Sequence, residues 1–320
     1  MRTAYEATSQ RLRWTYSYEE LETVRQELSD RAVEQCRRNW DTEASLLASE
    51  GSANVKVPKK FPSPEDERLL VTFYAASIRT IIAEGMLNNG RSLPSAIEGV
   101  AITFLKRFYL RTSVLEWHPK VIMPVCLFLA GKVCNHVFDI DNYVASFNKI
   151  KRDDILGVEY LVLQTLRFDV IVPRIQDALH GWFLKLQDAN PSGVNRIEAA
   201  YLVAQSHLKR SRLSDAEFIY TPSQIAATCF RMADARLFQT ALDKLLPLDA
   251  ESQGGTESNS GQQSLKPLLA RESLLDILQH VQNAIESAPL DASSEMDKVK
   301  AADKLVKLAQ DPAKNKSSAL

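Results

Sequence analysis

Two ionisable side chains fall where the sequence is otherwise apolar. Lys132 ends the most apolar predicted helix, and Glu159 lies within the apolar stripe of its own predicted helix. A Lys near a helix C-terminus can bond the last carbonyl groups, and a Glu at the edge of a stripe can reach water. If the two helices are instead neighbours, the two charges would pair, because burying either alone costs several kcal/mol. Such a pair would mark an apolar surface left open for a protein partner.

Other motifs that could carry chemistry fail on their spacing. Gly131-Lys132 resembles the end of a phosphate-binding loop, but Cys126 stands at the upstream glycine position and Val133 replaces the Ser or Thr. The four cysteines and five histidines form no CxxC or HxxxH pair, which favours buried thiols and loop imidazoles over a metal site. No GxSxG, kinase Gly-loop, HRD or DFG signature occurs. We therefore expect no metal, no cofactor and no catalytic residue.

The composition indicates a helical globular protein without an excess of positive charge. The chain has 320 residues, 45% of them apolar and 25% charged, a length that suggests about two domains. Only 11 residues are Gly, which is few for a chain of many short strands. The chain has 39 Lys and Arg against 40 Asp and Glu, and this balance argues against a protein whose main function is to bind the phosphate backbone of a nucleic acid. The longest apolar stretch, 121–131, is too short to span a membrane, and without a secretory signal we expect a reduced, intracellular protein.

Helical spacing recurs along nearly the whole chain, and capping residues mark the starts. Capping boxes predict helices after Ser17 and Thr221, and a Pro at the first helical position supports starts after Ser63 and His118. The small polar residues 249–264 show no periodicity and predict a flexible loop. The pattern as a whole predicts two blocks of about five helices, with a further helix at each terminus.

The surroundings of Lys132 and Glu159 resemble the cyclin box, and the similarity is to cyclin H rather than to the cell-cycle cyclins. It covers most of residues 9–286 in order. The segments that carry it are SQRLRWTYSYEEL (Ser9 to Leu21), SLPSAIEGVAITFLKRFYLRTSVLEWHPKVIMPVCLFLAGKV (Ser92 to Val133), GVEYLVLQTLRFDV (157–170) and YTPSQIA (Tyr220 to Ala226).

The resemblance implies an all-α protein with two five-helix cyclin folds in tandem and additional N- and C-terminal helices. The implied divisions are an N-terminal helical extension (1–58), a first cyclin box (59–170), a second cyclin fold (171–287) that contains the loop 249–264, and a C-terminal helix and tail (288–320).

The resemblance also implies a regulatory subunit, not an enzyme, that binds and activates a cyclin-dependent kinase. Lys132 and Glu159 match the pair that grips the kinase, and Leu163, Phe168 and Val170 match the apolar residues that accept a kinase helix. The implied complex is the CDK-activating kinase of transcription factor IIH, which has a RING-finger assembly factor as third subunit and binds the factor's core. It would phosphorylate the RNA polymerase II C-terminal domain in the nucleus. Neither a membrane nor direct nucleic-acid contact is expected.

Two segments depart from the family pattern. Many cyclins carry acidic residues just after the matching Lys, whereas Val133-Cys134-Asn135-His136 follow here. The substrate-docking motif of cell-cycle cyclins is represented only by Glu67-Arg68-Leu69-Leu70-Val71, so that function is not carried over. Three alternatives stay open: a cyclin C-like subunit of another transcriptional kinase, a factor IIB-like double cyclin fold that binds DNA, and an uncharacterised helical enzyme.

Overall fold

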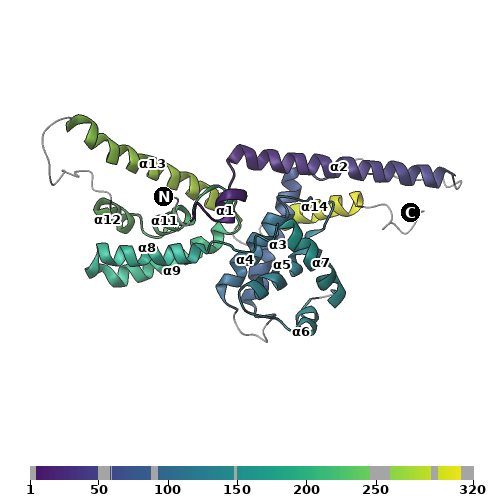
Figure 1. The fold of residues 1–320 in the computed structure, drawn as a ribbon, viewed down its shortest axis with the longest axis horizontal. Coiled ribbons are helices and arrows are strands. Elements are labelled where there is room, and N and C mark those ends of the chain that lie inside the picture. The colour runs from purple at the N-terminus through teal and green to yellow at the C-terminus, as the bar shows by residue number, and fades with distance from the viewer. Residues whose placement is uncertain are drawn as a thin grey trace. The chain divides into compact units, whose positions relative to one another are not determined.

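The computed structural model describes residues 5–49, 58, 60–87, 93–147, 150–245, 260–289 and 295–310 (Figure 1). Every regular element in these ranges is helical, which confirms the expected all-α class for this part of the chain. The chain divides into two compact units. The first unit comprises Tyr16–Val172 with Asp291–Leu320, and the second comprises Met1–Thr15 with Pro173–Leu290.

The first unit is a five-helix block with one long helix before it and one helix from the C-terminal part of the chain. Its helices are α2 (Tyr18–Ser49), α3 (Pro64–Ala83), α4 (Ser95–Phe108), α5 (Pro119–Val133), α6 (Ile140–Ala145), α7 (Arg152–Thr165) and α14 (Met296–Ala309). Helix α5 is the centre of the block, because residues 122–131 are all buried and it packs against α3, α4 and α7. A helix that is apolar on every side must be surrounded in this way.

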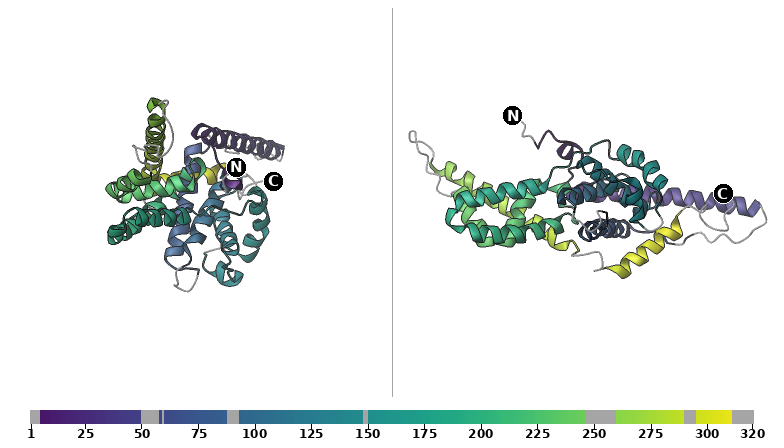
Figure 2. Two further views of the ribbon diagram at one scale, coloured as in Figure 1. Left: turned by 60° about the vertical axis from the view of Figure 1, so that its left-hand side comes forward. Right: turned by 90° about the horizontal axis from the view of Figure 1, so that it is seen from below.

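The second unit is also a helical block, built around α11. Its elements are α1 (Ser9–Arg13), α8 (Ile175–Ala189), the short 3-10 helix η1 (Pro191–Gly193), α9 (Val194–Ser211), α10 (Ala216–Ile219), α11 (Pro222–Ala233), α12 (Ala235–Leu245) and α13 (Ser260–Ser287). Residues 225–230 of α11 are buried against α8, α9, α12 and α13. The views of Figure 2 show α8 and α9 lying side by side.

The predicted helix starts after Ser17, Ser63 and Thr221 are confirmed as capping boxes. At α3, Ser63 Oγ accepts the N–H of Asp66 at 3.2 Å, and Asp66 Oδ2 accepts the N–H of Ser63 at 2.9 Å. Each box satisfies two N–H groups that would otherwise lack a helical partner, and an N-cap side chain contributes about 1 kcal/mol. These local signals explain why the sequence alone locates the helices.

The structure departs from two sequence expectations at segment ends. The loop expected over 249–264 ends earlier, because α13 already begins at Ser260; residues 249–259 lie outside the described residues. Adding a residue to an existing helix is easy compared with starting one, so α13 extends into the polar stretch before its apolar part. The extension expected over 1–58 is divided: α1 belongs to the second unit, where Gln10 Nε2 donates to the carbonyl oxygen of Glu217 at 2.9 Å.

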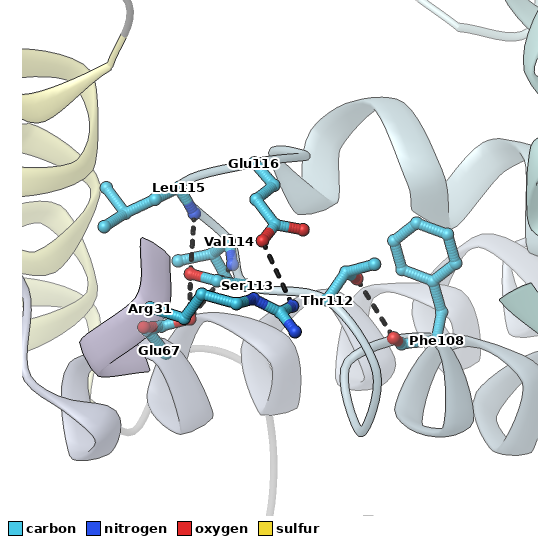
Figure 3. A network of polar contacts seen from close by, with 8 residues as sticks. All are labelled: Arg31, Glu67, Phe108, Thr112, Ser113, Val114, Leu115 and Glu116. Atoms are coloured by element: carbon cyan, nitrogen blue, oxygen red, sulfur yellow. Dashed lines mark hydrogen bonds and ion pairs between the residues drawn. The ribbon is translucent and has the colours of Figure 1, made fainter. Parts of the chain in front are cut away.

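A half-buried carboxylate on α3 holds the connection between α4 and α5. Glu67 Oε2 accepts a hydrogen bond from Ser113 Oγ at 2.7 Å and from the N–H of Val114 at 3.0 Å (Figure 3). Burial raises the pKa of Glu67, although these bonds act in the opposite direction. Arg31 on α2 adds an ion pair with Glu116 of the same connection at 3.3 Å. Glu67 thus braces the connection that leads into α5.

Helix α14 packs against α3 and also bonds His118, the N-cap of α5. His118 Nδ1 accepts the N–H of Lys120 at 3.1 Å, so the ring is neutral and its proton lies on Nε2. That Nε2–H donates to Asp303 Oδ1 on α14 at 2.9 Å. The apolar side of α14 is buried beside this bond through Val299, Ala302, Val306 and Ala309.

We expect His118 to make the stability of the first unit pH-dependent. Burial lowers the pKa of His118 below its ordinary 6.5, an effect that the bond to Asp303 only partly offsets. The unfolded chain therefore takes up a proton first as the pH falls, and the free energy of unfolding should drop by up to about 1.4 kcal/mol per pH unit once the pH falls below about 6.5. His118→Asn keeps a capping oxygen and cannot titrate, so urea titrations should show a shallower pH dependence.

His280→Asn is the matched control, because His280 is exposed on α13. This variant should keep the wild-type pH dependence. An unchanged slope in His118→Asn would contradict our assignment.

Candidate functional site

Lys132 and Glu159 meet, as the neighbouring-helix hypothesis predicts. Lys132 Nζ lies 2.6 Å from Glu159 Oε1 and 2.9 Å from Oε2, so one ammonium group bonds both oxygens. The Lys132 side chain stays 39% exposed and that of Glu159 16% exposed. Because the pair is partly hydrated, it contributes no more than about 1 kcal/mol to the stability of the isolated protein.

Phe128, which was not among the predicted site residues, supports the Lys132 side chain. The ammonium nitrogen lies 4.6 Å from the centroid of the Phe128 ring, one helical turn earlier on α5. This cation–π contact helps to hold the amine in place beside α7. The four-residue spacing between Phe128 and Lys132 could have predicted this contact. On an apolar helix, however, the same spacing is equally typical of core packing.

Helix α5 ends at Val133, one residue after Lys132, because the chain reverses in a Schellman motif. Asn135 has a φ of 55°, and the N–H of His136 donates to the carbonyl oxygen of Gly131 at 2.8 Å. A Cβ atom at Gly131 would lie 2.7 Å from the carbonyl oxygen of His136 and would overlap the Phe138 ring. Gly131 is therefore required by the close return of the chain, which accounts for the Gly-Lys pair without a phosphate.

Helix α7 ends in the same kind of motif. The N–H of Arg167 donates to the carbonyl oxygen of Gln164, and the N–H of Phe168 to that of Leu163, both at 2.9 Å. Arg167 and Phe168 both lie in the left-handed region, with φ of 55° and 58°. Residues other than glycine seldom adopt this conformation, and two in succession are unusual. The reversal leaves Phe168 exposed at the end of α7.

The three predicted apolar residues lie on α7 and the turn after it. Leu163 and Val170 are half-buried, whereas Phe168 is 56% exposed. The Phe168 ring contacts the ring of Tyr160 edge-to-face, at 6.2 Å between centroids. Tyr160, which is 64% exposed, was not predicted as a site residue because it falls outside the apolar stripe. We call the following set the α7 surface: Lys132, Glu159, Tyr160, Leu163, Phe168 and Val170.

The described residues offer neither a metal cluster nor a membrane-spanning helix. Among them, no group of three or more His, Cys, Asp and Glu side chains could hold a metal ion. No helix in the described ranges is long and apolar enough to cross a membrane. Cys126 and Cys229 are buried in the two helical cores, and burial raises the pKa of both thiols. Buried thiols of this kind are unreactive.

Two family models match the chain. Residues 89–171 match the cyclin N-terminal domain, and residues 177–286 match the cyclin C-terminal domain. Together these ranges cover more than half of the chain, one in each compact unit.

Individual relatives match over longer ranges. The chain is 29% identical to Cyclin CCL1 of Saccharomyces cerevisiae over 260 residues, which are 80% of this chain and 64% of the relative. It is 30% identical to Cyclin mcs2 of Schizosaccharomyces pombe over 214 residues, 67% of this chain and 64% of the relative. The match with Cyclin-H1-1 of Arabidopsis thaliana is 26% over 255 residues, 76% of this chain and 74% of the relative. The chain thus spans just under two thirds of the length of the two yeast proteins.

Solved structures share the fold. A chain of the CAK complex of Chaetomium thermophilum bound to ATP-γ-S matches with a TM-score of 0.77 and 23% identity, over 96% of this chain and 89% of that chain. A chain of the yeast TFIIK (Kin28/Ccl1/Tfb3) complex matches with a TM-score of 0.64 and 24% identity, over 88% and 100%. These likenesses agree with the expected tandem of two helical folds. With an N-terminal and a C-terminal cyclin domain in sequence, the chain belongs to the cyclin family.

Proposed function

We propose that this cyclin binds and activates a cyclin-dependent kinase, as the cyclin H-like subunit of a CDK-activating kinase. The observation that carries the proposal is the α7 surface, where a Lys–Glu pair borders exposed aromatic and half-buried aliphatic side chains. Relatives named Cyclin-H1-1, Cyclin CCL1 and Cyclin mcs2 support it, as does the fold shared with a chain of the CAK complex.

The proposed mechanism is allosteric and needs no catalytic group from the cyclin. A rigid α7 surface would accept the αC helix of the kinase only when the αC Glu points at the catalytic Lys, and so would favour the active arrangement. Shifting a 1:99 equilibrium to 99:1 takes about 5.5 kcal/mol of differential binding. Burying one fully exposed large apolar side chain contributes about 1.5–3 kcal/mol, so contacts of Tyr160, Leu163 and Phe168 made only with the active arrangement would be of the required order.

The wider assembly is part of the proposal. The yeast TFIIK complex, which contains a chain of similar fold, holds the kinase Kin28 and the third subunit Tfb3. This composition supports a kinase and a third subunit as partners of the present chain, and we propose that the third subunit is a RING-finger assembly factor. Association with the core of transcription factor IIH, a nuclear location and phosphorylation of the RNA polymerase II C-terminal domain would follow from membership of that complex.

The cyclin C-like alternative is less well supported by coverage. Cyclin-C1-1 of Arabidopsis thaliana is 28% identical over 145 residues, which are 43% of this chain. Cyclin-H1-1 of the same plant matches over 76% of the chain. The factor IIB-like alternative would need a basic face for DNA, and the net charge of -1 does not favour one.

Co-expression would test the function directly. The chain, expressed with each cyclin-dependent kinase of its own genome, should form a stable complex with the CDK-activating member and raise its activity on a polymerase C-terminal-domain peptide. A preference for a different transcriptional kinase would favour the cyclin C-like reading. Duplex DNA binding at micromolar affinity or better in about 150 mM salt, with a steep salt dependence, would favour the factor IIB-like reading.

Charge reversal would test the residues. Lys132→Glu or Glu159→Lys should leave the melting temperature close to that of the wild type, because the pair contributes little to the free protein. Kinase affinity should fall by about 2–5 kcal/mol, since the complex would then bury an unpaired charge. Leu163→Asp should have the same effect. Thermal melts measure the stability of each variant, and a kinase-activation assay measures the loss of kinase binding.

Arg196→Glu is the matched control for these reversals. Arg196 forms a bidentate pair with Asp234 at 2.6 and 2.8 Å, and its side chain is 56% exposed, but the pair lies in the second unit. The control should activate normally. Unfolding of all three α7-surface variants, or normal activation by all three, would show that the interface lies elsewhere.

A further inference from the structure

Arg107 on α4 is a fully buried arginine outside the α7 surface. Its exposed fraction is 0%, and Phe104 and Phe108 of the same helix are equally buried. A buried guanidinium group destabilises a fold unless its N–H groups find acceptors. The acceptors of the Arg107 hydrogen bonds therefore show which segments this buried residue connects.

One of these bonds connects α4 to the turn that follows α7. Arg107 Nη1 donates to the carbonyl oxygen of Asp169 at 2.6 Å. Asp169 lies between Phe168 and Val170, two of the apolar residues of the α7 surface. A charge-assisted bond of this length is among the stronger hydrogen bonds in proteins. A residue of the core thus fixes the backbone at the edge of the α7 surface.

The turn needs such a restraint because its conformation is unfavourable by itself. Arg167 and Phe168 both have positive φ without being glycine. The N–H of Asp169 donates to the carbonyl oxygen of Leu166 at 3.0 Å, and that of Val170 to the carbonyl oxygen of Phe168 at 2.9 Å. These bonds close the turn on itself, whereas the bond from Arg107 ties it to α4.

Several charged side chains lie near the turn. Burial lowers the pKa of Arg111, and the neighbouring charge of Arg167 lowers it further, although Asp169 opposes the effect. Burial raises the pKa of Tyr16 despite the nearby charges of Arg111, Arg167 and Arg107, so its phenol stays neutral. Arg107, Arg111 and Arg167 therefore act electrostatically on the same neighbourhood as the Asp169 carboxylate.

We propose that Arg107 is a positioning residue for kinase binding, which holds the Arg167–Asp169 turn in the conformation that presents Phe168 and Val170. This inference rests on the proposed function of the α7 surface. It makes a claim about the free protein as well: without the Arg107 bond, the turn opens while the helices stay folded.

Hydrogen exchange of the free protein tests that claim without a kinase. In Arg107→Met, the amides of residues 168–170 should exchange about tenfold faster or more, while helical content and the exchange of α5 stay as in the wild type. Arg107→Lys keeps a charged donor and should show a smaller rise; if Arg107→Met does not fold, this variant takes its place. Unchanged exchange at 168–170 in a folded variant would overturn the inference.

A double-mutant cycle tests the consequence for binding. Arg107→Met should weaken kinase affinity about tenfold. In a Phe168→Ala background the same substitution should change affinity less than about threefold. The reason is that Arg107→Met weakens binding mainly by displacing the Phe168 ring, which Phe168→Ala has already removed. If the two effects multiply instead, Arg107 acts by general destabilisation and the inference is wrong. It is also wrong if Phe168→Ala binds as tightly as the wild type.

Arg210→Met is the matched control. Arg210 Nε and Nη2 donate to the carbonyl oxygen of Ala288 at 3.0 and 2.9 Å, a similar arginine-to-backbone contact in the second unit. This variant should leave kinase affinity unchanged, and an equal loss in it would overturn the inference. If the wild-type chain binds no cyclin-dependent kinase, the proposed function fails, and the hydrogen-exchange result still decides whether Arg107 holds the turn.

Discussion

The burial of α5 on all sides is the constraint on which the candidate site depends. Its residues 122–131 pack against α3, α4 and α7, so the position and direction of the helix are set by the core. Lys132 is the first residue after this buried run, and it lies at the rim because the core ends there. The same packing brings α7 alongside, which places Glu159 within 2.6 Å of the amine.

The candidate site also depends on the chain reversals that end α5 and α7, and contacts with the core determine the geometry of both. At the end of α5 the returning backbone packs against Gly131 so closely that no side chain fits. At the end of α7 two successive residues take the left-handed conformation, and a bond from buried Arg107 meets the turn. The helices determine where the side chains stand, and the two reversals determine which of them reach solvent.

Local signals made the helices and the central pair predictable. Capping boxes and apolar periodicity are written within a few residues, and a charge inside an apolar stripe is itself a signal for a partner. The partner of Arg107 could not be predicted in this way, because its contact joins residues 62 positions apart. Positive φ at Arg167 and Phe168 was equally hidden, since neither is glycine. The placement of α1 depends on a contact between Gln10 and Glu217, which no local pattern encodes.

The α7 surface combines a pair that is weak in the free protein with apolar side chains that are costly to expose. Lys132 is partly hydrated, so its bond to Glu159 adds little until a partner excludes water and strengthens the electrostatic interaction. By themselves, exposed rings such as Phe168 and Tyr160 would bind many apolar surfaces and would not distinguish one partner from another. A partner that covers these two rings also covers Lys132 and Glu159. If that partner is purely apolar, the two charges lose their hydrogen bonds to water and gain none in return. In the proposed complex the pair would therefore select against wrong partners more than it stabilises the fold.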